Sequence, residues 1–116
     1  MTGAQMFITA LNMLGYTSSE RFQSKALTTI NQVYADIWYC VNDTVFTPLK
    51  NLADDINLNT RILHDIMPYG VAAVLAQIEN DGDNQQYFTR LYNRKRAGIN
   101  RMSNIVDTIP APEGEG

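Results

Sequence analysis

Residues 17–43 read "TSSERFQSKALTTINQVYADIWYCVND". Between Phe22 and Val41 the apolar residues recur at steps of three and four, which is the period of one face of an α-helix. At about 100° per residue these positions span an arc of roughly 160°, so one broad face is buried and the other is wet. Ser18 or Ser19 is expected to cap the start of this helix. The stretch therefore predicts a long amphipathic helix at the heart of a helical fold.

A shorter helix is predicted on the N-terminal side of this stretch. Thr2 is a residue type that caps helix starts, and Gly15 is a residue type that follows helix ends. The apolar residues expected on one side of this first helix are Met6, Ala10, Met13 and Leu14.

The segment that follows the long helix, "TVFTPLKNLADDINLN" at residues 44–59, has no helical period. Its apolar residues are irregularly spaced, and Pro48 and Asn51 interrupt them. We expect an extended connection or a small hairpin near residues 44–58, packed on the bundle by those apolar side chains.

The next stretch, "NTRILHDIMPYGVAAVLAQIENDGD" at residues 59–83, predicts a helix that is broken by Pro68. A proline inside a helix costs about 3 kcal/mol, whereas in the first turn it costs little. We therefore expect a short helix over residues 60–66 and a main helix from Pro68 to Glu79. Four small residues of the main helix would let a neighbouring helix approach closely: Gly70, Ala72, Ala73 and Ala76.

The last helix is expected over residues 84–107, with Asp83 as its cap. Residues 108–116 are rich in Pro, Gly and Glu and predict a flexible C-terminal tail. The predicted fold is all-α, a small bundle of about four helices in one domain over residues 1–107. The core is expected from Leu27, Ile30, Tyr34, Ile37, Trp38, Val74, Leu75, Ile78, Phe88, Leu91, Tyr92 and Ile99.

Composition is typical of a single globular domain. The chain has 116 residues, of which 45% are hydrophobic and 18% are charged. No run of about 18 apolar residues occurs, so no membrane-spanning helix is expected. Cys40 is the single cysteine, so no internal disulfide can form, and the cytosol, or an assembly built there, is the natural setting. The N-terminus lacks the basic region that opens a secretory signal.

The sequence has no motif that predicts catalysis or a cofactor. His64 is the single histidine and no CxxC pattern accompanies it, so no metal site is expected. Neither GxxxxGK[ST] nor GxGxxG occurs, so no phosphate-binding loop can be named. The adjacent carboxylates Asp54 and Asp55 are expected to face solvent or a partner. We expect no enzyme and no cofactor.

Positive charge is concentrated in "FTRLYNRKRAGINR" at residues 88–101, which holds five of the nine basic residues of a chain with a formal net charge of −3. On a helical wheel Arg90, Arg94 and Arg101 fall within about 40° of one another, opposite the apolar positions. Arg96 lies to their side. Guanidinium groups bind carboxylates in bidentate fashion and are enriched at interfaces.

Three interpretations of this basic helix stay open. The first is a solvated face. The second is DNA binding, because "RLYNRKR" mixes basic and aromatic residues, although a pI near 4.9 opposes phosphate binding. The third is a head-to-tail contact between copies, which makes a ring if it closes. Its expected contact residues are Arg90, Arg94, Arg96 and Arg101 with Asp54, Asp55, Asp81 and Asp83.

Three segments of the chain resemble the head-tail connector (adaptor) proteins of tailed bacteriophages. They are "LADDI" at residues 52–56, "YGVA" at residues 69–72 and "YFTRLYNRK" at residues 87–95. The resemblance covers roughly residues 19–100. Asn59 departs from it, because a proline is common at that position in the family.

The resemblance implies a structural protein of the virion, assembled in the host cytoplasm. Such adaptors form a ring, usually dodecameric, that binds the portal protein on one side and a tail or stopper protein on the other. Packaged DNA passes through the lumen without specific binding. The C-terminal tail would dock on a neighbour or on the portal through Ile109, Pro110, Pro112, Glu113 and Glu115. A helical DNA-binding regulator and a general protein-interaction scaffold are the alternatives.

Overall fold

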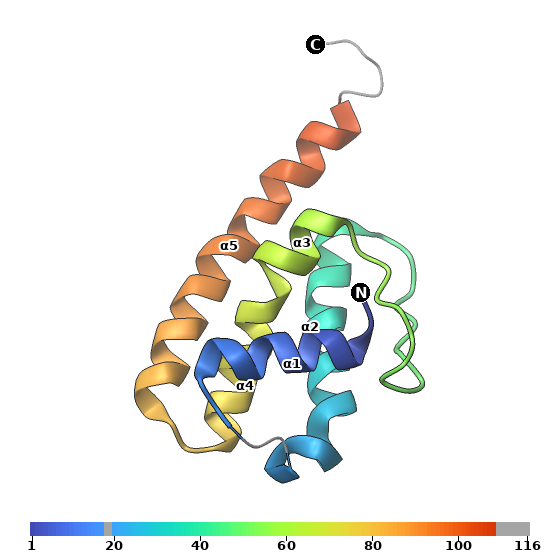
Figure 1. Ribbon diagram of the computed structural model, residues 1–116. Helices are drawn as coiled ribbons and strands as arrows, with labels where there is room; N and C mark the ends of the chain where they lie inside the picture. Colours follow the sequence, from blue (N-terminus) through green and yellow to red (C-terminus); the bar gives the residue numbers. More distant parts are fainter. Residues whose placement is uncertain (18–19, 109–116) are drawn as a thin grey trace.

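The chain folds into a bundle of α-helices (Figure 1). This computed structural model describes the backbone of residues 1–17 and 20–108 and the side chains of residues 1–17, 20 and 22–99. No strand occurs in that part of the chain, and the prediction of an all-α fold is confirmed. The helices are α1 (Gly3–Leu14), the 3₁₀ helix η1 (Glu20–Lys25), α2 (Ala26–Val41), α3 (Thr60–Asp65), α4 (Met67–Ile78) and α5 (Gly82–Thr108).

Helix α4 is the centre of the bundle, because it packs against α1, α2, α3 and α5. Figure 1 shows α1 lying across the bundle while α5 runs along α4 and projects beyond the other helices. Eight of the twelve residues of α4 are buried, so this helix is apolar on nearly all sides. A helix that is apolar on all sides has no amphipathic period. The sequence pattern therefore predicted only three of its residues, Val74, Leu75 and Ile78, as core residues.

The break predicted at Pro68 is confirmed. Asn59 caps α3, since its side chain accepts a hydrogen bond from the amide of Ile62 at 2.9 Å. The helix is interrupted at Ile66, and Pro68 then stands in the first turn of α4, where its missing amide hydrogen is not needed. The expected four helices are therefore present, with the third divided into α3 and α4.

Gly70 allows three helices to come together, as the small residues of α4 predicted. A Cβ atom on Gly70 would lie 2.7 Å from Cε1 of Tyr92 on α5 and 2.8 Å from Cγ1 of Val33 on α2. Carbon atoms do not pack this closely without displacement of one of them. The absence of a side chain at Gly70 is thus what seats the Tyr92 ring between α4 and α2.

The start of the long helix differs from the prediction. Residues Glu20–Lys25 form η1, and α2 begins at Ala26 without a side-chain cap. Ser18 and Ser19, the expected caps, lie outside the described residues. Phe22 of η1 is buried, and its ring stacks on Tyr16 with the ring centroids 5.7 Å apart.

The cap of α5 is Asp81, and the prediction of Asp83 is wrong. Oδ1 of Asp81 accepts a hydrogen bond from the amide of Asn84 at 3.4 Å, and its carbonyl accepts one from Gln85 at 2.8 Å. The turn "NDGD" offers two aspartates, and only Asp81 precedes the first orphan amides of the helix. Asp83 lies exposed in the first turn of α5.

Side chains of α2 anchor the connection over residues 44–58, which runs without secondary structure over residues 45–49 and turns at residues 52–53. Asn31 bonds both backbone groups of Leu49, accepting from its amide at 2.8 Å and donating to its carbonyl at 3.0 Å. The amide of Asn57 donates to the hydroxyl of Tyr34 at 3.0 Å. These bonds satisfy backbone groups that a second strand would otherwise pair, and no strand forms in this connection, so the hairpin alternative is wrong. The extended alternative holds only on either side of the turn at residues 52–53.

The predicted core divides into two groups. Six residues are buried: Ile30, Tyr34, Ile37, Leu75, Phe88 and Ile99. Six are only partly buried: Leu27, Trp38, Val74, Ile78, Leu91 and Tyr92. Helix α1 contributes more than expected, because Phe7 and Leu11 are buried beside the predicted Met6, Ala10 and Leu14.

Candidate functional site

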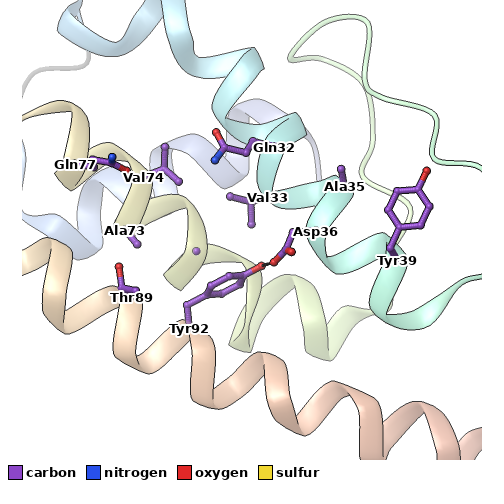
Figure 2. Close-up of a pocket in the computed structure, with 11 residues that line it drawn as sticks. Gln32, Val33, Ala35, Asp36, Tyr39, Ala73, Val74, Gln77, Thr89 and Tyr92 are labelled. Atoms are coloured by element: carbon purple, nitrogen blue, oxygen red, sulfur yellow. Dashed lines mark hydrogen bonds between the residues drawn. The ribbon is translucent and has the colours of Figure 1, made fainter.

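The inner side of α5 is fixed by a polar cluster around Asp36 of α2 (Figure 2). The hydroxyl of Tyr92 donates to Oδ2 of Asp36 at 2.6 Å, and Nη1 of Arg96 lies 3.0 Å from Oδ1. Burial of the phenol and its bond to the Asp36 carboxylate raise the pKa of Tyr92. Tyr92 therefore stays a neutral donor, and the cluster ties α5 to α2.

Lys95 forms the second tie of this inner side. Its Nζ lies 3.0 Å from Oδ1 of Asp65 on α3 and 4.7 Å from the centroid of the Tyr69 ring on α4. Both inner ion pairs are partly exposed, so each is worth at most about 1 kcal/mol. Arg96, which the sequence placed among the contact residues, is thus paired with Asp36 of its own chain.

The outer side of α5 carries the charges that remain. Arg90 and Arg94 are exposed, and within the described part of the chain they make no hydrogen bond or ion pair. Tyr87 is 52% exposed and Leu91 is partly exposed. These residues follow one another at helical spacing and form one strip of surface. We call it the outer stripe: Tyr87, Arg90, Leu91 and Arg94.

Two of the four predicted acidic contact residues hold the chain's own turns. Oδ2 of Asp54 accepts from the amides of Lys50 and Asn51 at 2.9 and 3.1 Å. Oδ2 of Asp81 accepts from the hydroxyl of Tyr16 at 2.8 Å, and this bond contributes most to lowering the pKa of Asp81. Burial, followed by the bond to Asp81, raises the pKa of Tyr16 to about 12.

The other two predicted acids face outward. The Asp55 side chain is 82% exposed, and its Oδ1 lies 3.8 Å from the terminal amine of Met1. Asp83 is exposed in the first turn of α5. Figure 1 shows the connection that carries Asp54 and Asp55 on the side of the molecule opposite α5. One copy thus presents arginines on one side and an exposed carboxylate on another.

A groove of about 530 Å³ lies between α2, α4 and α5, and the sequence did not predict it (Figure 2). Its lining combines apolar side chains with the polar groups of Gln32, Asp36, Gln77 and Thr89. The signal available in the sequence was an aromatic residue on the polar side of the long helix, Tyr39, which is 60% exposed. The lining residues are Gln32, Val33, Ala35, Asp36, Tyr39, Gly70, Ala73, Val74, Gln77, Thr89 and Tyr92.

The remaining predicted contacts fall outside the described part of the structure. The side chain of Arg101 is one of them. The tail residues Ile109, Pro110, Pro112, Glu113 and Glu115 are the others, so the docking of the tail stays a prediction.

The described residues also bear on metal binding and membranes. They contain no group of three or more His, Cys, Asp or Glu side chains arranged to hold a metal ion. None of the helices in residues 1–17 and 20–108 has the length and hydropathy of a transmembrane span. Burial, followed by the nearby Asp36, raises the pKa of the free thiol of Cys40, which lowers its reactivity.

Comparison with known proteins returns no match: neither a protein-family model, nor a curated protein, nor a solved structure matches this chain.

Proposed function

We propose that the chain is a structural subunit without catalytic activity, a head-tail connector (adaptor) protein of a tailed bacteriophage. In this proposal, copies assemble into a ring below the portal protein and join it to a tail or stopper protein. The ring is part of the virion, and packaged DNA crosses its lumen without specific binding. The proposal rests on the family resemblance of residues 52–56, 69–72 and 87–95 and on the surface chemistry of α5.

The observation that carries the proposal is the outer stripe. Arg90 and Arg94 stand unpaired within the described part of a chain whose net charge is −3, and the half-exposed Tyr87 stands beside them. Tyrosine and arginine are the residue types enriched at protein interfaces and at their energetic hot spots. A stripe of this composition suits a contact with the carboxylates of another protein molecule.

The packing of the resembling segments supports the proposal further. Gly70 belongs to one of these segments and Tyr92 to another, and the two residues contact each other in the bundle. The resemblance therefore follows the packing that seats α5 on α4 and α2. The same packing turns Arg90 and Arg94 away from the core, so the fold and the stripe depend on the same residues.

The head-to-tail arrangement explains how such a contact repeats. Helix α5, which carries the arginines, and the connection over residues 44–58, which carries the exposed Asp55, lie on opposite sides of one copy (Figure 1). A contact between two different faces is heterologous, and it generates a ring when the rotation between copies closes. We propose that the stripe meets a neighbouring copy or the portal protein.

Arg94→Glu tests the proposed function. Arg94 is exposed on α5, so we expect the variant to keep its circular dichroism spectrum and to change stability by less than about 0.5 kcal/mol. Mixed with the portal protein of the same phage, the unmodified chain should form large complexes in sedimentation velocity, and Arg94→Glu should not. Arg61→Glu makes the same charge change at an exposed position of α3 and should assemble normally. Normal assembly of Arg94→Glu would show that the stripe is merely solvated.

A DNA-binding regulator is the second candidate, favoured by the mixture of arginine and tyrosine in the stripe. Gel shift with mixed-sequence duplex DNA at low salt separates the two proposals. Tight binding that weakens steeply as salt rises would favour the regulator, because phosphate contacts release counterions. The adaptor proposal expects no retention of the duplex.

A further inference from the structure

The first part of the connection between α2 and α3 is fastened to α2 along one edge. Nε1 of Trp38 donates a hydrogen bond to the carbonyl of Thr44 at 2.9 Å, and the amide of Phe46 donates to the hydroxyl of Tyr39 at 3.1 Å. The backbone makes no turn or bend over residues 45–49. Two alternate residues of a nearly straight segment are thus bonded to the same helix.

The residues that alternate with these two have free backbone groups. Neither the amides nor the carbonyls of Val45 and Thr47 bond to another described residue. In an extended chain the backbone groups of alternate residues point to the same edge. Because Thr44 and Phe46 bond to α2, Val45 and Thr47 present two amides and two carbonyls on the opposite edge. A free edge of this kind is a template for a strand of another chain.

The side chains of this edge also suit strand pairing, because valine, phenylalanine and threonine are favoured in strands. The ring of Phe46 packs inward against the Tyr34 ring, with 4.9 Å between the centroids. Val45 is 83% exposed, and Thr47 is also exposed. This alternation is that of a strand with one buried face. An added strand would cover the exposed apolar side chain of Val45.

The C-terminal tail has a sequence that suits pairing along one edge only. Residues 109–113 read "IPAPE" and lie outside the described part of the structure. Proline lacks an amide hydrogen and favours extended backbone in itself and in the residue before it. The two prolines occupy alternate positions, so in extended form the amides of Ile109, Ala111 and Glu113 share one edge. Because proline in sheets is confined to edge strands, this sequence suits the last strand to be added to an edge.

The place where the tail begins favours a second copy as the molecule that accepts it. Helix α5 ends at Thr108, and Figure 1 shows this helix projecting beyond the other helices. The eight residues that follow span at most about 28 Å when extended. The tail thus starts away from its own bundle, where a neighbouring copy of an assembly would stand.

We propose that the tail of one copy adds as a strand to the edge at Val45 and Thr47 of a second copy. Ile109 and Ala111 supply two amides and two carbonyls, which match the groups that the edge offers. The contact is heterologous because the tail and the edge are different surfaces, so it can repeat around a ring in addition to the contact of the outer stripe. This inference rests on the proposed assembly of copies and identifies the surface that accepts the tail.

Disulfide crosslinking between two preparations tests the inference. One preparation carries Val45→Cys and the other Ala111→Cys, each in a chain with Cys40→Ser, so that each copy holds one thiol. Both are mixed with the portal protein of the same phage, oxidised mildly and digested for mass spectrometry. Because side chains on one face of two paired strands have Cβ atoms about 5 Å apart, we expect a disulfide between the two preparations.

Two substitutions at Thr47 of the first preparation provide matched controls. Thr47→Pro removes the amide hydrogen that the tail would bond, and Thr47→Ala keeps it. The Thr47 amide has no partner among the described residues, so both variants should keep the circular dichroism spectrum. Thr47→Pro should lower the disulfide yield about fivefold, as the loss of one hydrogen bond implies, and Thr47→Ala should leave it unchanged. Asn12→Cys in place of Val45→Cys, at an exposed position of α1, should give no disulfide above background.

Sedimentation velocity of the same mixtures separates this inference from the proposed function. Large complexes without the disulfide, or equal yields from Thr47→Pro and Thr47→Ala, would overturn addition of the tail and leave the adaptor proposal standing. A disulfide that forms without portal protein, at the highest soluble concentration, would support the addition independently of any complex with the portal. No large complex and no disulfide in either mixture would overturn both proposals.

Discussion

The two sides of α5 carry the same kinds of residues and use them differently. On the inner side, Tyr92, Lys95 and Arg96 each bond a carboxylate of another helix. On the outer side, Arg90 and Arg94 are exposed, and the described residues supply no hydrogen-bond or ion-pair partner for them. Position around the helix therefore decides whether a basic residue fixes the fold or remains available for another molecule.

The largest expected change in the free energy of unfolding comes from a comparison of two glycines. One faces the inner side of α5 and the other lies on α5 itself. Gly70→Ala places a Cβ atom 2.7 Å from the Tyr92 ring, and overpacking of this kind costs about 1–3 kcal/mol. Gly98→Ala places its Cβ atom in open space, so it should gain about 0.5–1 kcal/mol from helix propensity. Urea denaturation of both variants should give changes of opposite sign.

Equal changes for the two glycine variants would contradict the packing of Tyr92 on Gly70. Gly70→Ala combined with Tyr92→Leu provides a further check, because the smaller apolar side chain relieves the close contact with the new methyl group. The two substitutions should therefore be non-additive in the free energy of unfolding.

A matched pair of arginines gives the next largest effect. Arg96→Ala removes the ion pair with Asp36 and the contact with the Tyr92 ring, so it should lower the free energy of unfolding by about 0.5–1 kcal/mol. Arg94→Ala should change it by less than about 0.5 kcal/mol, because Arg94 is exposed. Chemical denaturation at low and high salt measures both variants, and the Arg96 effect should shrink as salt rises.

The effects of the same two variants on assembly should follow the reverse order of their effects on stability. Arg94→Ala should weaken the large complexes with the portal protein more than Arg96→Ala does, because Arg96 is held by Asp36. If Arg96→Ala proved the more damaging to assembly at unchanged stability, the division between inner and outer sides would be wrong.

The fold was predictable from the sequence where one signal acted over a few residues. Thr2 marks the start of α1 and Gly15 its end, and Pro68 divides α3 from α4. These signals were readable because caps and proline act within one turn of helix. The start of α2 was not predictable in this way, since the buried Phe22 stacks on Tyr16 of a preceding segment. The choice between Asp81 and Asp83 was not predictable either, because it depends on which residue precedes the first free amides of α5, and the turn "NDGD" offers both.

The sequence predicted the candidate site only in one respect: a helical wheel gives the side of a helix on which each residue lies. The wheel placed Arg90 and Arg94 away from the core and Arg96 to their side, and the first two are exposed as predicted. It could not provide the partner of Arg96, because Asp36 lies 60 positions earlier in the chain. The groove needs residues of three helices, so no pattern within one helix indicates it.

The smallest expected effect concerns the bond that ties the start of α5 to Tyr16. The pKa of Tyr16 is raised from 10.0 to about 12 in the folded chain, so the folded state keeps this proton where the unfolded state loses it. The stabilisation is therefore complete below pH 10 and is lost as the pH rises toward 12. Tyr16→Phe should make the fall in the free energy of unfolding over that range shallower.

The same bond also makes the free energy of unfolding depend on pH at the acid end, where stability falls as the pH decreases rather than as it increases. Changes at both ends of the pH profile make the test specific. Because the pKa of Asp81 is lowered below 3.8, mainly by the Tyr16 hydroxyl, its stabilisation is present above that pH and is lost as the pH falls through the folded pKa. Tyr16→Phe should therefore flatten both ends of the pH profile, measured by denaturant titration at each pH. Asp81→Asn should remove the acid part and lessen the alkaline part, since the carboxylate charge contributes to raising the pKa of Tyr16. A profile that changes at one end only in Tyr16→Phe would mean that the two groups titrate independently, and the tie at the start of α5 would then be weaker than its 2.8 Å geometry implies.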